Sequence, residues 1–178
     1  EDPRLQFKKL YRPFDVVGGG FYAIRQLDAD RYGFLLADME GHGMAAAMYT
    51  MQLSILCDRH TELLGHPAEF AAAVNNDLVG IFGDDVSFAA AVCGVLDART
   101  GAVRLTGAGG PAVLIARTSG AIEKVSAPGM PLGFMQQLAY TDQYIELKPG
   151  DAMLLFSDGA FEIHSAQNTL LNVEGFMG

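Results

Sequence analysis

The sequence predicts an α+β domain built mainly from antiparallel β-sheet, with two helices inserted early in the chain. Short apolar runs follow one another around turn residues, two helical stretches interrupt them, and single strands do not alternate with single helices. The chain has 178 residues, of which 50% are hydrophobic and 19% are charged. This composition is typical of a packed protein, and the length fits one domain over residues 1–178 and is too short for two.

The first part of the chain contains a predicted hairpin and two helices. Residues 21–27 and 31–37 are strand-like and enclose a tight turn at 28–30. A helix is predicted from His42 to about Leu64. Apolar residues recur in it at helical spacing, which predicts that they pack in the core: Met44, Met48, Met51, Ile55 and Leu56. A second helix is predicted to begin at Pro67, with a buried face made by Phe70, Ala73, Val74 and Leu78.

The rest of the chain consists of predicted strands. Their ranges are 87–97, 102–109, 113–118, 121–126, 143–147 and 152–158. Turn residues separate them in pairs, so three hairpins are expected, the last around Lys148-Pro-Gly-Asp151. Residues 128–134 are a Pro/Gly loop, and a short helix is expected from Gly159.

Charge and cysteine content exclude some classes of partner. Lys and Arg number 12 against 21 Asp and Glu, giving a net charge of −9. Nucleic acid and anionic membranes need clustered cations, so neither is expected as a partner. The chain begins Glu1-Asp2-Pro3 without an initiator Met or a targeting segment, which predicts a piece of a longer, cytoplasmic protein. Cys57 and Cys93 have no CxxC spacing and are predicted to be buried free thiols.

Two aspartates follow apolar strands in the same way. Asp38 ends FLLAD and Asp158 ends MLLFSD, each with a glycine close behind. Either one alone is typical of an Asp-Gly turn. Together they allow a second interpretation, because carboxylates at adjacent strand ends can share Mg²⁺ or Mn²⁺, which prefer oxygen ligands.

Other motifs give weaker indications. Residues Gly41 to Ala46 match G-x-G-x-x-A between a strand and a helix, which is typical of a dinucleotide site, but no second strand with an acidic end follows ~20 residues on. Residues 18–20 are three glycines without the Gly-Lys-Ser/Thr of a phosphate loop, and a turn or bulge is favoured. The four histidines have no zinc-site spacing.

Five segments occur in an order that is more specific than any one of them. They are YRPFDVVGGGFYA, ADMEGHGMAAAMYTMQL, SFAAAVCGVLDARTGAVRLTGAGGPAVLI, PGMPLGF and LKPGDAMLLFSDGAFE, and they cover nearly the whole chain. Taken together, the chain resembles the SpoIIE/RsbU branch of the metal-dependent PPM (type 2C-like) protein phosphatases. The resemblance implies a sandwich of two central antiparallel β-sheets flanked by helices.

The resemblance also implies a reaction and a set of ligands. Family members dephosphorylate phosphoserine or phosphothreonine on proteins, often antagonists of anti-sigma factors. Two Mn²⁺ or Mg²⁺ ions hold a bridging water or hydroxide for in-line attack on phosphorus. Carried over by position, Asp38 would bridge both metals, the carbonyl of Met39 would bind one, and Asp158 would bind the other. A phosphorylated regulatory protein, an upstream sensor domain in the same chain and a homodimer are the partners expected.

The sequence departs from the family pattern at several positions. Gly20 stands where the family has the metal Asp of G-G-D, Ala23 where it has the Asp of F-Y-D, and Gly110 where it has the His of N-A-G-H. The family's last metal Asp, in a D-D-x-T strand, has no match before Gly178. Glu40 replaces the usual Ser, and we hypothesise that its longer side chain reaches toward the space left at position 20.

Three functions follow from these observations. The first is a serine/threonine phosphatase domain that uses Mn²⁺ better than Mg²⁺, because Mn²⁺ tolerates a poorer ligand set. The second is a pseudophosphatase that keeps the fold to bind a phosphoprotein or a partner. The third is a nucleotide-cofactor enzyme, which depends on the Gly41–Ala46 segment alone.

Overall fold

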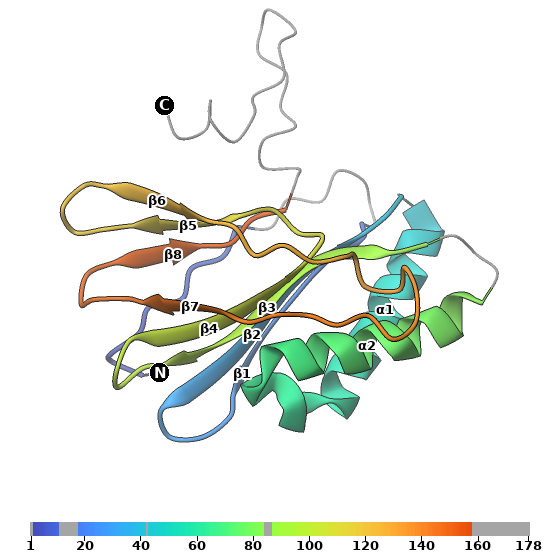
Figure 1. The fold of residues 1–178 in the computed structure, drawn as a ribbon, viewed down its shortest axis with the longest axis horizontal. Coiled ribbons are helices and arrows are strands. Elements are labelled where there is room, and N and C mark those ends of the chain that lie inside the picture. Colours follow the sequence, from blue (N-terminus) through green and yellow to red (C-terminus); the bar gives the residue numbers. More distant parts are fainter. Residues whose placement is uncertain (1, 11–17, 42, 84–86, 158–178) are drawn as a thin grey trace, which may run out of the picture.

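The computed structural model describes residues 2–10, 18–41, 43–83 and 87–157 as two antiparallel sheets packed face to face, with helices on the outer face of the larger sheet (Figure 1). The elements in chain order are β1 (Gly20–Gln26), β2 (Arg31–Met39), α1 (Gly43–Arg59), the 3-10 helix η1 (Thr61–Gly65), α2 (Pro67–Phe82), β3 (Ala89–Asp97), β4 (Ala102–Ala108), β5 (Val113–Ala116), β6 (Ile122–Val125), β7 (Gln143–Glu146) and β8 (Ala152–Leu154). The predicted helix from Gly159 lies outside the described residues. The α+β prediction and the two-sheet sandwich are confirmed.

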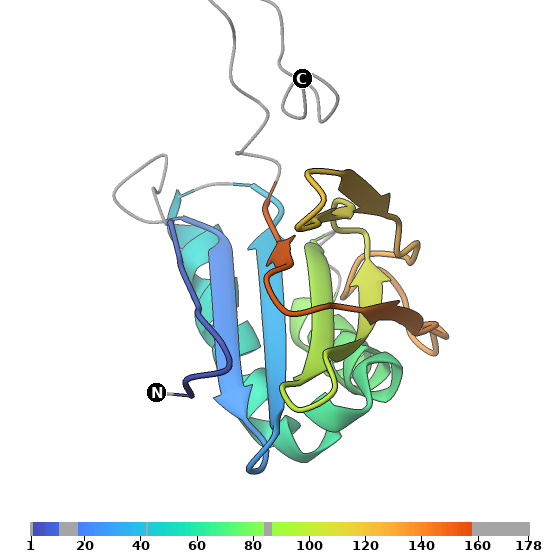
Figure 2. The same cartoon turned by 90° about the vertical axis from the view of Figure 1, so that its left-hand side faces the viewer.

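Strand pairing follows the predicted hairpins in three cases. The larger sheet has the order β1-β2-β3-β4-β7 and the smaller one β6-β5-β8. Hairpins β1–β2, β3–β4 and β5–β6 pair as expected around their turns. Figure 2 views the larger sheet with both long helices behind it.

The predicted hairpin of the last two strands is wrong. β7 pairs with β4 in the larger sheet, whereas β8 pairs with β5 in the smaller one. The turn between them therefore crosses from sheet to sheet, with Gly150 at φ 88°. Arg117 of the smaller sheet fixes this crossing, because it donates hydrogen bonds to the carbonyl of Glu146 and the carboxylate of Asp151. Alternating hydrophobicity marks a strand but does not identify its partner.

The helices pack on the larger sheet through one hydrophobic core. Pro67 begins α2 as predicted, and Phe70, Val74 and Leu78 are fully buried. Gly33 in β2 allows η1 to approach, since a Cβ there would lie 2.1 Å from a methyl carbon of Leu64. This core lies between the helices and the face of the larger sheet that points away from the smaller sheet.

The prediction that the methionine stripe of α1 is core is wrong for four of its five residues. Leu56 is buried, but Met44, Met48, Met51 and Ile55 are 69%, 61%, 67% and 54% exposed. The helix instead buries the face of Ala46, Leu53, Leu56 and Cys57. Both faces of α1 are rich in apolar residues, so periodicity could not tell which one faces the sheet.

The second core lies between the two sheets. Phe34, Val92 and Leu105 of the larger sheet lie in one buried cluster with Val113 of the smaller sheet. Leu5, from the segment that precedes β1, packs against it. Alternation along β2 thus sends even-numbered residues toward the smaller sheet and odd-numbered residues toward the helices.

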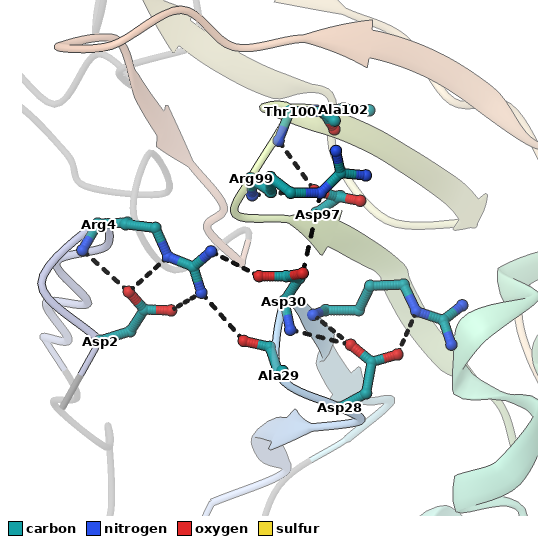
Figure 3. Close-up of polar contacts among 10 residues, drawn as sticks. Asp2, Arg4, Asp28, Ala29, Asp30, Asp97, Arg99, Thr100 and Ala102 are labelled. Atoms are coloured by element: carbon teal, nitrogen blue, oxygen red, sulfur yellow. Dashed lines mark hydrogen bonds and ion pairs between the residues drawn. The ribbon is translucent and has the colours of Figure 1, made fainter.

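The start of the described chain is fastened to the turn between β1 and β2. Arg4 donates to the carboxylates of Asp2 and Asp30 and to the carbonyl of Ala29, as Figure 3 shows. The hydroxyl of Tyr32 also donates to Asp2. The Arg4 guanidinium and amide hold the pKa of the Asp2 carboxyl well below its usual range. These contacts hold the start of the described chain against the β1–β2 turn.

Two further sequence predictions concern thiols and membranes. Cys57 and Cys93 are buried free thiols, as expected. Burial raises the pKa of Cys57 to about 12 and that of Cys93 further, so neither is a reactive thiolate at neutral pH.

Within the described ranges, no helix has the length and apolarity required to cross a bilayer.

Candidate functional site

A cavity of about 210 Å³ opens at the C-terminal end of β2, between two strands of the larger sheet and the segments that follow β4 and β8. Its lining comes from β2, β3, the connection after β4 and the segment after β8: Leu36, Ala37, Asp38, Ala90, Ala91, Val92, Gly109, Gly110, Pro111, Phe156 and Ser157. Residues about 120 positions apart in the chain thus meet here. The cavity contains the first of the two predicted aspartates.

Asp38 lies near the end of β2, which pairs with β1 on one side and β3 on the other, and it is half-buried. Gly20 of β1 is its partner on one side and Ala90 of β3 is its partner on the other. Directly paired residues share a face of the sheet, so the two positions nearest to this carboxylate bear no ligating side chain. The substitution at Gly20 therefore removes a carboxylate from the immediate neighbourhood of Asp38.

The substitution at Ala23 has a different consequence. Ala23 pairs with Leu35, which belongs to the core under the helices, and it is 6% exposed. A side chain at position 23 points to the helix layer, away from the face that carries Asp38. The absence of an Asp at position 23 therefore takes no ligand from this cavity.

The carbonyl of Met39 lies against the glycine-rich segment. The Met39 amide donates to the carbonyl of Gly19 (3.1 Å), and the hydroxyl of Thr50 in α1 donates to the same oxygen (3.0 Å). A Cβ on Gly19 would come within 2.7 Å of the Met39 carbonyl oxygen. Glycine at position 19 thus allows the segment before β1 to lie close to β2 at Met39. The carbonyl oxygen of Met39 is the one that the resemblance assigns to a metal.

The wall opposite Asp38 has no room for the family's histidine. A Cβ on Gly110 would lie 2.7 Å from the carbonyl oxygen of Ala91 and 2.8 Å from a methyl carbon of Val92. A Cβ on Gly109, whose φ is 76°, would lie 2.6 Å from the ring of Pro131. The backbone after β4 is packed so closely that side chains are excluded at both positions.

The two remaining predicted site residues are placed only in part. Asp158 lies outside the described residues, but its neighbour Ser157 lines the cavity with Asp38. Glu40 is exposed, and its amide donates to the carbonyl of Phe88 (2.9 Å). The contact of Glu40 with the space beside Gly20 stays a prediction.

The described lining is acidic and has no protein cation. Asp38 is its one charged residue, and Lys, Arg and His are absent from the lining that the structure describes. Among the described residues, no group of three His, Cys, Asp or Glu side chains could hold a metal ion. One carboxylate and one carbonyl fit a single divalent ion better than a pair, because two neighbouring cations need more negative charge between them.

The dinucleotide interpretation is wrong for the fold that surrounds Gly41. A dinucleotide-binding unit needs two parallel strands joined through a helix. Here the next strand after α1 and α2 is β3, which pairs antiparallel with β2. The glycines Gly41 and Gly43 have φ of 89° and 77° and make the sharp entry into α1 instead.

Sequence reasoning did not identify several cavity residues. Ala90, Pro111 and Phe156 line the cavity without a polar group that could have marked them. Their signal is the strand register, which brings Ala90 beside Asp38 and is set by contacts distant in sequence.

Known proteins resemble this chain in sequence over most of its length. Residues 28–177 match the family model of Stage II sporulation protein E (SpoIIE). The phosphoserine phosphatase RsbP of Bacillus subtilis (strain 168) is 24% identical over 162 residues, which cover 89% of this chain and 40% of that protein. Stage II sporulation protein E of the same organism is 23% identical, with 83% of this chain and 18% of that protein covered. The chain thus spans less than half the length of both relatives.

Solved structures share the fold. The SiaA-PP2C domain of Pseudomonas aeruginosa superposes with a TM-score of 0.83 at 22% identity, covering 94% of this chain and 67% of that one. The RsbU and RsbW domains of Rv1364c from Mycobacterium tuberculosis give a TM-score of 0.73 at 25% identity, covering 84% and 41%. With the family match over residues 28–177, they identify the chain as a member of the SpoIIE family with a PP2C-type phosphatase fold.

Proposed function

We propose that this chain is the phosphatase domain of a bacterial signalling protein and hydrolyses phosphoserine or phosphothreonine on a regulatory protein at the Asp38 cavity. The observation that supports this most is the meeting of Asp38 and Ser157 in one cavity. Ser157 directly precedes Asp158 in the sequence, which supports the proposal that Asp38 and Asp158 act at the same cavity. An antagonist of an anti-sigma factor is the proposed kind of substrate, in keeping with the resemblance.

The acidity of the described cavity lining favours a divalent cation in this function. A phosphoryl group carries about two negative charges near neutral pH and would meet the Asp38 carboxylate in a lining whose described residues include no Lys, Arg or His. In the proposal, Asp38, the Met39 carbonyl and Asp158 hold Mn²⁺ or Mg²⁺. The bound ion would supply positive charge for the phosphoryl oxygens and lower the pKa of a bound water.

The chain's own residues have simple roles in this proposal. Asp38 is fixed in position by the ladders to β1 and β3 on both sides. Phe156, 9% exposed, closes one wall with apolar surface and keeps bulk water from the carboxylate. Gly109 and Gly110 line the cavity with backbone alone, so no side chain at these two positions competes with a phosphorylated side chain for the cavity.

Phosphate release from a phosphoserine protein tests the proposal. The full-length protein that contains this chain should turn over such a substrate with Mn²⁺, and more slowly with Mg²⁺ at saturation. Asp38→Asn, which keeps the shape and removes the charge, should lower turnover by a factor of about 100 or more. Tyr144→Phe, at an exposed site on β7, is the matched control and should leave turnover unchanged. Equal turnover by Asp38→Asn and the parent contradicts the proposal.

A second candidate function is supported by the flanks of Asp38. Gly20 and Ala90 give it no neighbouring carboxylate, and Gly110 has no space for a histidine. A chain with this site could hold a phosphoprotein or partner without hydrolysing it. Mn²⁺-dependent binding of a phosphoserine protein without phosphate release distinguishes this candidate from the first.

The upstream sensor domain and the homodimer stay predictions of the resemblance, and the cytoplasmic location stays a prediction from the sequence. Glu40→Ala tests the proposed role of Glu40. Unchanged Mn²⁺ affinity in that variant would show that its carboxylate is not a ligand.

A further inference from the structure

A buried amide side chain on α2 joins the helix layer to the loop at 128–135. Asn75 is fully buried, although its neighbours Val74 and Leu78 belong to the hydrophobic core. Its Oδ1 accepts a hydrogen bond from the amide of Gly133 (2.9 Å), and its Nδ2 donates to the carbonyl of Met135 (2.8 Å). A carboxamide can satisfy an amide and a carbonyl at once, which an apolar side chain cannot.

The same loop touches two walls of the Asp38 cavity. Leu132 and Ala89 exchange two backbone hydrogen bonds of 2.9 Å each, at the end of β3 that leads into the cavity. The amide of Gly109 donates to the carbonyl of Gly129 (2.8 Å), and Gly109 itself lines the cavity. The loop therefore ties the start of β3 to the end of β4.

The loop has little freedom to find another position on α2. Gly133 has φ of 84°, and a Cβ there would lie 2.3 Å from the ring of Phe82. Leu132 is 1% exposed and packs in the core under the helices. The two hydrogen bonds of Asn75 reach the loop at Gly133 and Met135, directly after Leu132, which pairs with Ala89.

We infer that Asn75 is a positioning residue for the Asp38 cavity, because it fixes the loop that holds the two strand ends forming the cavity wall. Ala89 pairs with Met39, so a displacement at Ala89 reaches the ligand oxygens through one backbone pairing. Asn75 itself does not line the cavity. The effect on metal binding rests on the proposed function, whereas the effect on the strand ends does not.

Hydrogen exchange followed by mass spectrometry on the full-length protein tests this inference. In Asn75→Leu, peptides covering 87–92 and 107–112 should exchange about tenfold faster or more, because the loop that hydrogen-bonds to Ala89 and Gly109 loses both of its bonds to the Asn75 side chain. A peptide covering 24–33, on the far side of the sheet, should be unchanged. The Mn²⁺ affinity from calorimetry should fall about tenfold in parallel.

Two further variants separate positioning from general stability. Asn75→Asp keeps an acceptor for the Gly133 amide and should regain part of the protection that Asn75→Leu loses. Asn76→Ala is the matched control: it removes the acceptor of the Gln137 amide (2.9 Å) and the longer contact with Asn75 Nδ2 (3.4 Å), but keeps both bonds of Asn75 to the loop, so the strand ends should keep their protection.

Each result decides the matter. The inference is overturned if exchange in Asn75→Leu rises by the same factor in all peptides, or if it rises only in the loop. It is also overturned if the strand ends exchange faster but the Mn²⁺ affinity is unchanged. If the parent binds no Mn²⁺, the proposed metal site is contradicted and the exchange pattern alone decides on Asn75.

Discussion

The charge beside Asp38 depends on two small residues. Gly20 and Ala90 are paired with it, so the cavity has one described carboxylate where a two-metal centre needs several. The backbone at Gly110 is packed so closely against β3 that a histidine does not fit there. At the scale of single residues, the site combines a retained acidic residue with neighbours that offer no further ligands.

Restoring an acidic residue at position 20 should strengthen metal binding. Gly20→Asp places a second carboxylate on the same face as Asp38 and should raise the Mn²⁺ affinity about tenfold or more. Ile24→Asp is the matched control, because it adds the same charge to the same strand face four residues away. Calorimetry that finds equal affinities for both variants would contradict the assigned position of the metal.

The close approach of β4 to the loop that follows β6 predicts a large loss of stability from one methyl group. A Cβ on Gly107 would lie 1.6 Å from the carbonyl oxygen of Ala127. Gly107→Ala should therefore lower the free energy of unfolding by about 3 kcal/mol. Gly80→Ala, in α2 with nothing within 4 Å, should raise it by about 0.5 kcal/mol. Urea unfolding of both variants checks the sign of each effect.

At the scale of elements, α1 has an apolar face on each side. The buried face packs on the sheet, and the other exposes three methionines and an isoleucine. Leu53→Ala should cost about 3 kcal/mol of unfolding free energy, because it empties a fully buried site. Met48→Gln should change it by less than about 0.5 kcal/mol. Similar losses in both variants, measured by urea unfolding, would show that the exposed face is covered.

The crossing between β7 and β8 predicts a pH dependence. The amide of Lys148 and the guanidinium of Arg117 lower the pKa of Asp151 to about 2. The stabilisation is complete above the ordinary Asp pKa of about 3.9 and disappears as the pH falls toward 2. Asp151→Asn should therefore be less stable than the parent at pH 6, with a difference that shrinks between pH 4 and 2.

Denaturant unfolding across this pH range is the measurement. Asp58→Asn, which breaks the exposed ion pair with Arg25, is the control and should show a much smaller difference at pH 6. A deficit of Asp151→Asn that is the same at pH 6 and pH 2 would contradict the assignment.

Local sequence predicted the elements better than their partners. The hairpins around 28–30 and 98–101 follow from turn residues between alternating strands, and the start of α2 follows from Pro67. The separation of β7 from β8 depends on Arg117, more than 25 residues away, which no local pattern reveals. Local sequence also did not reveal which face of α1 packs on the sheet, because both faces are apolar.

At the scale of the whole molecule, the sandwich brings Asp38 of β2 and Ser157, which follows β8, to one cavity. Asp38 could be singled out because Asp158 follows a second apolar strand in the same way. The apolar lining residues, among them Ala91 and Phe156, could not, since alanine and phenylalanine are ordinary core residues. The register that brings Ala90 beside Asp38 comes from packing across the whole domain.

The central claim is that the Asp38 cavity binds a divalent cation, which its acidic lining then needs in order to accept a phosphoryl group. A calorimetric Mn²⁺ titration of the full-length protein, beside the Asp38→Ala/Asp158→Ala double variant, tests it most directly. The account predicts binding at or below about millimolar Mn²⁺ in the parent and none in the double variant. An absence of binding in the parent, or equal binding in the double variant, would contradict it.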